Sequence, residues 1–484
     1  HRDLHVRSRR QRQMCIRDRH KAGLYNNFVN MIGAQTIGNA TLIAYDNNPI
    51  LSTDPWLGYD HYAYFGSWYL PYEIPENIYQ NILSSKYIFF SHGHPDHLNP
   101  DSIHKFKNNI ILLGDHVGKR ILTDLRSQGF NVVVLKDRSW TELSKNISVM
   151  SVSTKIQDTI LIIKIKDDIF INLNDAGPMN HRFIKKVVKK FKRKFLLSIS
   201  GWGDADMINF YDKDDKFIEP LAAKKNPVGD YLSLIAKLFS ANYVIPFSSF
   251  HEYQREDSIW ANKYVTPMYE YKNGIHKDIT FVEPFALINS EKDDDIRSLD
   301  LKKKKLIIKN SNEFKDNWSE ILEPEDKKII NDYFDKFELL KDKIGFINFI
   351  VGKKEFNLKM QGPENKGLSF ELPRNSLVEA CKYNIFDDLL IGNFMKTKLY
   401  NLKNLYDPTI NFNTVVCKYG DNGLAYSKDE LFEYEKLYAK RMGIEYFYDL
   451  FANESKNYFE FFFKNYKDSK YYTKLRKYYY SYLK

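Results

Sequence analysis

The sequence predicts an α+β fold in which mixed β-sheets are covered by helices. Between residues 37 and 289, short apolar runs bounded by turn residues alternate with helix-like stretches, a pattern typical of hairpins interspersed with helices. The chain has 484 residues, and 43% of them are hydrophobic. It is therefore long enough for two or three domains and apolar enough to bury a sizeable core.

Pairs of apolar runs separated by short polar turns predict hairpins. They occur at Thr41–Tyr45 with Pro49–Thr53, and at Thr159–Ile165 with Ile169–Leu173. Other apolar runs predict buried strands, with helices between them. The expected strands are Tyr87–Ser91, Ile110–Leu113, Val132–Leu135, Phe195–Ile199 and Tyr243–Phe247, and the expected helices are Val117–Gln128, Arg182–Lys192 and Asp230–Phe239.

A charged segment divides the chain. Residues 291–310 contain three consecutive Asp and four consecutive Lys, which predicts a charged linker. Residues 21–290 are expected to form the first domain, and residues 311–484 a C-terminal α+β domain of unknown role. The elements expected in the second domain are a helical stretch at Pro324–Leu340, strands at Phe346–Val351 and Leu368–Leu372, and helices beginning near Ser376 and Ser427. The final stretch, Tyr458–Lys484, is expected to be an amphipathic helix packing on its own domain, with a membrane or nucleic-acid surface as the alternative.

The first twenty residues differ in composition from the rest. They contain seven Arg, two Asp and no Lys, whereas Lys outnumbers Arg elsewhere, and without them the formal net charge of +10 falls to +5. Residues 1–20 are therefore expected to be a non-native or disordered segment. The alternative is a nucleic-acid-binding arm or a targeting peptide.

Cysteine usage and hydropathy indicate the compartment. The three cysteines, Cys15, Cys381 and Cys417, are too few for a disulfide framework or a thiolate zinc site. The sequence has no run of 18 uninterrupted apolar residues, the length that predicts a transmembrane helix. A cytoplasmic protein without a transmembrane segment is therefore expected.

Residues 91–97, Ser-His-Gly-His-Pro-Asp-His, carry the most informative chemistry. Three of the twelve His lie within six residues, directly after a predicted strand. On an extended loop, His92 and His94 alternate and point the same way, so both imidazoles can bind one metal ion. Asp96 and His97 continue the turn and can reach a second ion. A surface His cluster without a metal is the alternative, but such a cluster need not follow a buried strand in this order.

This HxHxDH motif resembles that of the metallo-β-lactamase superfamily. Upstream, residues 51–57 (Leu-Ser-Thr-Asp-Pro-Trp-Leu) resemble a strand end in the branch containing N-acylphosphatidylethanolamine phospholipase D, ascorbate-phosphate lactonases and CMP-N-acetylneuraminate hydroxylase. Downstream, Asn172–Asp175 resembles the strand end with the bridging Asp, and Val244–His251 the late strand whose His completes the site. The resemblance implies a four-layer αββα metallo-β-lactamase sandwich with an additional α/β C-terminal domain.

The resemblance also implies a ligand set. His92 and His94 would bind one ion, Asp96, His97 and His251 a second, and Asp175 would bridge both. Asp96 would in addition orient the attacking water, so it is the expected catalytic residue. The implied cofactor is one or two divalent metal ions, with zinc expected. Considered alone, Asp175 is better explained as a hairpin-end residue and His251 as a core His; the first motif and the order of the strands favour ligation.

The superfamily usually has one more His before the bridging Asp, and this chain departs from that pattern. The expected place, residues 153–158, contains no His. Asp158 is an alternative oxygen ligand, or else a turn residue. An oxygen ligand makes iron or manganese more plausible. A mononuclear site, and catalysis itself, stay open at this point.

Three further segments are candidates for function. The aromatic stretch 59–68 predicts a pocket mouth, with His61 and Trp68 as candidate substrate-binding residues, or else a packed loop over the sheet. Residues 201–206 form a second candidate mouth loop. The acidic pair Asp387 and Asp388 suits acid–base chemistry, although such pairs more often cap helices or form salt bridges.

The leading hypothesis is a metal-dependent hydrolase that cleaves a phosphodiester, ester, lactone or amide bond in a small molecule or a lipid or sugar conjugate. Two alternatives are a degenerate, non-catalytic binding module and an oxidative sugar-nucleotide enzyme. The oxidative enzyme needs a separate electron-transfer partner, because three Cys without Cys-x-His spacing cannot build a Rieske site. No nucleic acid is expected as a partner, since the basicity without residues 1–20 is modest. The oligomeric state is left open.

Overall fold

The computed structural model describes residues 31–58, 60–200, 207–407, 409–443 and 446. The predicted non-native segment 1–20, the mouth loop 201–206 and the final stretch 458–484 lie outside the described residues.

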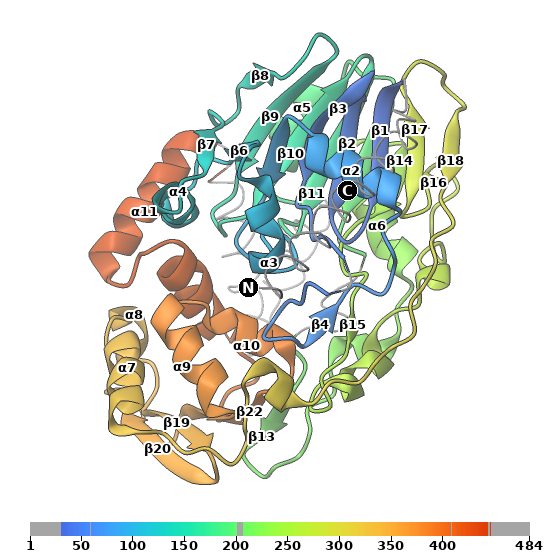
Figure 1. Cartoon of the computed structure of the whole chain (residues 1–484). Helices are drawn as coiled ribbons and strands as arrows, with labels where there is room; N and C mark the ends of the chain where they lie inside the picture. Colours follow the sequence, from blue (N-terminus) through green and yellow to red (C-terminus); the bar gives the residue numbers. More distant parts are fainter. Residues whose placement is uncertain (1–30, 59, 201–206, 408, 444–445, 447–484) are drawn as a thin grey trace, which may run out of the picture.

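Two large sheets lie side by side in the upper half of the molecule (Figure 1). In sheet order, the first contains β18 (Ile296–Ser298), β17 (Ala286–Asn289), β1 (Ile32–Ile37), β2 (Thr41–Asp46), β3 (Asn48–Thr53), β5 (Tyr87–Phe90), β6 (Ile110–Leu113) and β7 (Asn131–Val134). The second contains β16 (Thr280–Phe281), β14 (Tyr243–Pro246), β12 (Arg193–Ser198), β11 (Asp168–Asn174), β10 (Thr159–Ile165), β9 (Ile147–Ser153) and β8 (Trp140–Glu142). The two predicted hairpins are confirmed as β2–β3 and β10–β11.

Alternate side chains of these strands enter different cores. In β10, Leu161 and Ile163 pack between the sheets, whereas Ile160 and Ile162 face the outer helices. The strand is apolar throughout because both of its faces are covered. The outer face of the first sheet is covered by α2 (Glu76–Ser84), α3 (Pro100–Ile103) and α4 (Arg120–Ser127), and that of the second by α5 (His181–Val188) and α6 (Val228–Phe239). This layering agrees with the αββα arrangement that the resemblance implies.

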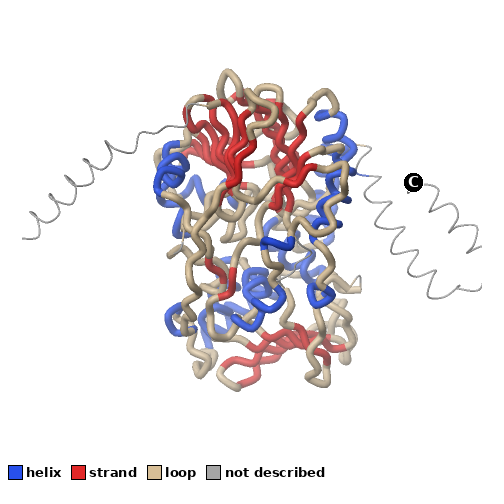
Figure 2. Tube along the Cα trace, turned by 90° about the vertical axis from the view of Figure 1, so that its right-hand side faces the viewer, coloured by secondary structure: helices blue, strands red, loops and turns tan. Residues whose placement is uncertain are grey.

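A third sheet lies at the opposite end of the molecule, with helices between it and the sandwich (Figure 2). Its strands, in order, are β13 (Phe210–Asp212), β22 (Lys396–Tyr400), β21 (Gly367–Glu371), β19 (Phe346–Val351) and β20 (Lys354–Lys359). Its helices are α7 (Pro324–Phe334), α8 (Glu338–Lys341), α9 (Arg374–Tyr383) and α10 (Phe386–Gly392), followed by a π-helix at Thr414–Asn422 and by α11 (Lys428–Met442). Smaller elements are the pair β4 (Trp68–Tyr69) and β15 (Glu252–Tyr253), and 3-10 turns at His104–Phe106, Leu221–Lys224, Ile259–Tyr264, Met268–Glu270 and Ser311–Phe314.

The segment predicted as a charged linker contributes to the fold. Within 291–310, β18 pairs antiparallel with β17 at the edge of the first sheet. Leu299 and Leu301 pack against the apolar cores. In addition, β13, which precedes this segment in the chain, pairs with β22 in the third sheet. The sandwich and the C-terminal elements are thus interleaved rather than joined by one free connection.

The C-terminal elements contact the sandwich through α4 and α10. The Arg120 guanidinium, at the start of α4, donates to the carbonyls of Tyr383, Asn384 and Asp421 at 2.7–2.9 Å. At the end of α10, the Gly392 carbonyl accepts from Ser67 Oγ at 2.6 Å. In the described part of the chain, no helix combines the length and apolarity needed to cross a bilayer.

Candidate metal centre

The HxHxDH motif occupies a tight loop between β5 and α3. The Ser91 amide donates to Asp54 Oδ1 at 2.8 Å, which anchors the start of the loop. The His94 carbonyl accepts from the amides of His97 (3.0 Å) and Leu98 (2.8 Å), which closes the turn. These bonds hold the motif side chains at the strand end, where the sandwich meets the C-terminal elements.

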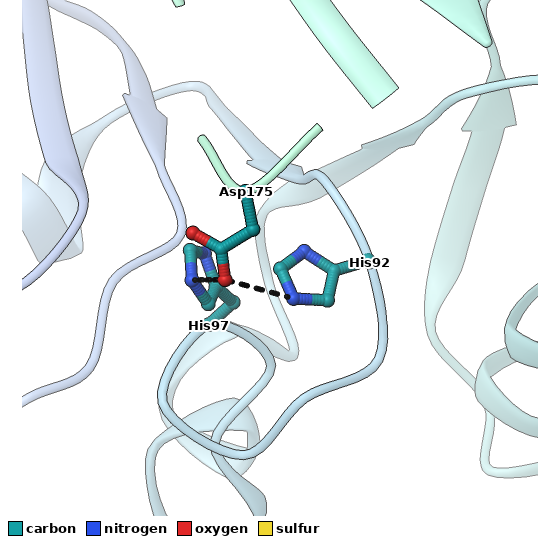
Figure 3. Close-up of side chains that lie close together, drawn as sticks. All are labelled: His92, His97 and Asp175. Atoms are coloured by element: carbon teal, nitrogen blue, oxygen red, sulfur yellow. Dashed lines mark ion pairs between the residues drawn. The ribbon is translucent and has the colours of Figure 1, made fainter. Parts of the chain in front are cut away.

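His92, His97 and Asp175 converge in this region (Figure 3). Asp175 Oδ2 lies 3.3 Å from His97 Nε2 and 3.7 Å from His92 Nε2. The two His follow β5 of the first sheet, whereas Asp175 follows β11 of the second. The ends of the two facing sheets therefore bring these side chains together from positions about eighty residues apart in the chain, as the αββα layout predicts.

Asp96 is held beside this group by hydrogen bonds. Its Oδ1 accepts from the Tyr64 hydroxyl at 2.5 Å, and its Oδ2 accepts from Asn39 Nδ2 at 2.9 Å. Oδ2 also lies 3.4 Å from His97 Nε2. Burial raises the pKa of Tyr64, and the Asp96 carboxylate raises it further, so the phenol stays a proton donor. The aromatic stretch 59–68 was predicted as a pocket mouth, but nothing in the sequence indicated a contact from Tyr64 to Asp96.

Asp54, in the segment that carries the resemblance upstream, lies beside the His97 ring. The carboxylate is fully buried, and its Oδ2 lies 3.5 Å from His97 Nδ1. Metal-binding His side chains commonly have such a carboxylate behind the ring, which sets the tautomer and the ring orientation. His97 thus has Asp54 on one side of its ring and Asp96 and Asp175 on the other.

His94 lies between His92 and the C-terminal helix α10. Its Nδ1 is 3.0 Å from His92 Nε2, and its Nε2 is 2.9 Å from Asp387 Oδ2. His94, Asp387 and Asp388 form a second group whose ligand atoms all lie within 4.8 Å of one another. The acidic pair was singled out in the sequence, but its proximity to His94 was not predicted.

His251 takes a different position. It follows β14 and stacks flat on Trp68, with ring centroids 3.2 Å apart and ring planes at 1° to each other. Neither of its ring nitrogens has a hydrogen-bond partner within the described ranges. His251 belongs to neither group of closely spaced ligand atoms. The structure therefore does not gather all six predicted ligands into one cluster, and ligation by His251 stays a prediction.

The two predicted substrate-binding residues lie in packed surroundings. Trp68 is only 4% exposed and contacts Tyr64 as well as His251. His61 Nδ1 is 2.7 Å from Ser102 Oγ, and the side chain is partly exposed. Contact of either residue with a substrate stays a prediction.

Asp158, the candidate substitute for the missing His, lies behind His92. Its Oδ1 is 4.0 Å from His92 Nδ1, on the side of the ring away from Asp175. The carboxyl is buried, and burial raises its pKa. Asp158 and His92 line a cavity of about 260 Å³ that also contacts His116.

His116 is held by hydrogen bonds to other side chains. Its Nε2 is 2.5 Å from Thr159 Oγ1, and its Nδ1 is 3.4 Å from the Tyr438 hydroxyl of α11. Burial lowers its pKa to about 4, so the ring is neutral in the folded protein near pH 6. This environment indicates a structural residue rather than a metal ligand.

We expect His116→Gln to flatten the acid dependence of stability. Between about pH 6.5 and pH 4, the unfolded state binds a proton at His116 that the folded state does not. The free energy of unfolding therefore falls as the pH falls, by at most about 1.4 kcal/mol per pH unit from this group. Denaturant unfolding of the variant and the wild type at pH 7, 6 and 5 measures the difference. Parallel pH profiles of the two proteins would contradict the assignment.

The donor atoms of the first group suit a divalent transition-metal ion. His97 Nε2 is buried and forms no hydrogen bond within the described ranges, although two carboxylates lie within 3.4 Å. Burial lowers the pKa of His97, but Asp96 and Asp175 outweigh burial and raise it well above the usual value. This ring therefore takes a proton when no other cation is present. Two imidazoles and a carboxylate form a donor set that zinc and iron accept.

Comparison with known proteins gives a limited result. No family model and no curated protein matches the chain. The chain is similar to the solved structure of a metallo-hydrolase from Ignicoccus hospitalis, with 13% identity over 53% of this chain and 97% of that chain and a TM-score of 0.34. It is similar to a metallo-β-lactamase-fold protein from Bacillus subtilis, with 8% identity over 52% of this chain and 94% of that chain and a TM-score of 0.30. It is also similar to a diiron β-hydroxylase from Streptomyces venezuelae, with 12% identity over 53% of this chain and 54% of that chain and a TM-score of 0.35. These likenesses are too low to assign a family or a chemistry, so both depend on the residues described above.

Proposed function

We propose that this chain is a metal-dependent hydrolase of the metallo-β-lactamase type, cleaving a phosphodiester, ester, lactone or amide bond. The observation that carries the proposal is the meeting of His92, His97 and Asp175 from the ends of two facing sheets, where Asp175 Oδ2 lies 3.7 and 3.3 Å from Nε2 of the two His. Buried imidazole and carboxylate groups are costly unless they are paired or bind a cation. Zinc is the ion proposed, in one or two sites, with iron or manganese as the alternatives.

The residues around the ion have separable roles. We assign His92, His94, His97 and Asp175 to metal binding, with Asp96 and His251 as further ligands. When bound, a divalent ion would make hydroxide available from water at neutral pH and would polarise the scissile bond. Asp96 is the proposed catalytic residue, because Tyr64 and Asn39 hold its carboxylate in one orientation next to His97. A ligand held in this way can position an attacking water without reorganisation.

The surroundings favour a small substrate or a small portion of a conjugate. Cavities of about 260 and 240 Å³ flank Gly93, and they are lined in part by His92 and by His94. A small molecule, or the head of a lipid or sugar conjugate, is the proposed substrate, and His61 and Trp68 are proposed to contact it. We also propose a cytoplasmic location, and an additional C-terminal domain within 311–484.

Removal of the metal tests the proposal. We expect chelator-treated protein to lose hydrolysis of a panel of phosphodiesters, esters, lactones and amides, and stoichiometric Zn²⁺, Fe²⁺ or Mn²⁺ to restore it. Because the ion displaces the proton on His97, metal affinity should rise with pH. Metal analysis together with the activity assay at pH 6, 7 and 8 measures both effects. Protein that binds no divalent ion at pH 8 would refute the proposal.

One observation favours a second candidate, a non-catalytic binding module. His251 stacks on Trp68 and lies outside both groups of closely spaced ligand atoms, so one predicted ligand is not in place. A module of this kind binds metal without turning over any substrate. The third candidate is an oxidative enzyme with a separate electron-transfer partner. It requires redox-active iron bound by the same ligands. Metal identity and the substrate panel separate these three candidates.

A further inference from the structure

We propose that Asp387 of α10 is a positioning residue for the metal ligand His94, so that the C-terminal part of the chain completes the metal centre. The inference goes beyond the proposed hydrolase, because Asp387 is outside the predicted ligand set. It rests on the proposed metal centre but not on hydrolysis. Asp387 and His94 are 293 residues apart in the chain, yet their side chains are in hydrogen-bonding contact at 2.9 Å.

The orientation of the His94 ring carries the proposal. Its Nδ1 lies 3.0 Å from His92 Nε2, a separation that lets both nitrogens bind one ion. A neutral imidazole has one proton and one free lone pair. If Nδ1 offers its lone pair to the ion, Nε2 carries the proton and donates a hydrogen bond to Asp387 Oδ2. Asp387 then selects the tautomer that can bind metal and holds the ring toward His92, as a carboxylate behind a ligating His commonly does.

Among the described residues, no other side chain bonds directly to the acidic pair, although the buried Lys418 ammonium and the Arg120 guanidinium act on Asp387 at longer range. Neither carboxylate forms an ion pair with Lys or Arg there, and the α10 N-cap has no side-chain hydrogen bond. The Arg120 guanidinium directs its hydrogen bonds to backbone carbonyls instead. Asp387 is 3% exposed and Asp388 is 8% exposed, so water does not replace these partners. His94 is thus the side chain to which the Asp387 carboxylate is hydrogen-bonded among the described residues.

The helix that carries Asp387 is held at both ends. Near its start, the Phe386 amide donates to Asp421 Oδ2 at 3.0 Å. Near its end, Asn393 Nδ2 donates to the Tyr253 hydroxyl at 2.7 Å. Tyr253 belongs to β15, which pairs with β4, and it also contacts the Trp68 ring. A group that positions a ligand must itself be held rigidly, and α10 meets that requirement.

Direct binding of a cation by His94, Asp387 and Asp388 is the competing explanation of the same group. It requires His94 Nε2 to give up its proton. The ring would then have to present Nδ1–H to His92 Nε2, which would occupy the nitrogen nearest to Asp175. The first group would therefore lose a ligand. If Asp387 only positions His94, then His94 Nε2 carries the proton, and His94 Nδ1 and His92 Nε2 both stay free to bind the ion.

The test is a matched pair of substitutions in the full-length protein, Asp387→Ala and Asp388→Ala. Both remove a buried carboxylate from the same turn of α10, but only Asp387 is in hydrogen-bonding contact with His94. We expect Asp387→Ala to raise the Kd for Zn²⁺ about 10- to 100-fold in a chelator-competition assay. Asp387→Asn keeps an acceptor oxygen, so this variant should lose less Zn²⁺ affinity than Asp387→Ala. The Kd of Asp388→Ala should stay within about threefold of the wild-type value.

Two further measurements make the outcomes decisive. Thermal unfolding of the metal-free variants shows whether each one folds, and the absorption spectrum of Co²⁺-loaded protein reports the ligand geometry. A changed Co²⁺ spectrum in Asp387→Ala, with wild-type unfolding, supports a positioning role. Equal losses of affinity in both Ala variants would overturn it in favour of direct ligation, and wild-type affinity in Asp387→Ala would overturn it outright. If the wild type binds metal without hydrolysing any substrate, the proposed function fails while this inference stands.

Discussion

Replacing Asp96 with Ala is expected to lower turnover by about a thousandfold, the largest catalytic effect of any single substitution in this chain. Loss of a ligand that also orients the attacking water removes several kcal/mol of transition-state stabilisation. About 4 kcal/mol corresponds to three powers of ten in rate. The structure adds a second cost, because Tyr64 and Asn39 both lose their acceptor. Steady-state kinetics on the best substrate of the panel, with metal content measured on the same sample, gives the result.

Asp158→Ala is the informative companion to this variant. Asp158 lies 4.0 Å from His92 Nδ1 and on the far side of the ring from Asp175. If it replaces the missing His as a ligand, its loss lowers metal occupancy. If it is a buried turn residue, occupancy stays unchanged and stability drops by about 1 kcal/mol. Should Asp96→Ala match the wild type on every substrate that the wild type cleaves, the hydrolase proposal fails and the binding-module candidate replaces it.

Asp316→Ala is expected to have the largest effect on stability. The Arg255 side chain is fully buried, and its Nη1 donates to Asp316 Oδ2 at 2.7 Å. Asp316 also accepts from the amide and hydroxyl of Ser376, at 3.0 and 2.5 Å. Its removal leaves a buried cation short of a partner, and breaking such a pair costs about 3–5 kcal/mol. Urea unfolding of the variant should show this loss in the free energy of unfolding.

Asp257→Ala is the matched control for this effect. Asp257 also pairs with Arg255, at 2.7 Å, but its side chain is 14% exposed, so water can replace part of the lost interaction. We expect a smaller loss of stability than for Asp316→Ala. Because Arg255 precedes the charged segment 291–310 and Ser376 follows it, the Asp316 variant should also weaken the contact between the sandwich and the C-terminal elements. Equal stability of the two variants would contradict the assigned role of the buried pair.

The sandwich was largely predictable from the sequence because its strands are buried on both faces. Such strands appear as continuous apolar runs, and both predicted hairpins lie where β2–β3 and β10–β11 form. Element ends were less predictable. The helix expected at Val117–Gln128 begins at Arg120, because Gly118 and Lys119 adopt positive φ of 80° and 55°. Strand β9, in which three Ser interrupt the apolar residues, was not predicted.

The sequence by itself determined the local chemistry of the site. The order of His92, His94, Asp96 and His97 after an apolar strand indicated metal binding, and Asp175 was expected at the end of a hairpin. The features of the loop are local, because a loop of seven residues places its own side chains within reach of one another. The Asp387–Asp388 pair was visible as well, but its partner was not.

The tertiary structure decided which distant groups meet at this loop. It stacks His251 on Trp68, joins Tyr64 to Asp96, and places Asp387 against His94. None of these pairs leaves a periodic signal in the sequence, since each depends on how separate strands and helices pack. The same packing pairs β13 with β22 and β18 with β17 across the predicted linker. Contacts of this kind arise from the burial of whole faces in three dimensions, which local residue patterns do not specify.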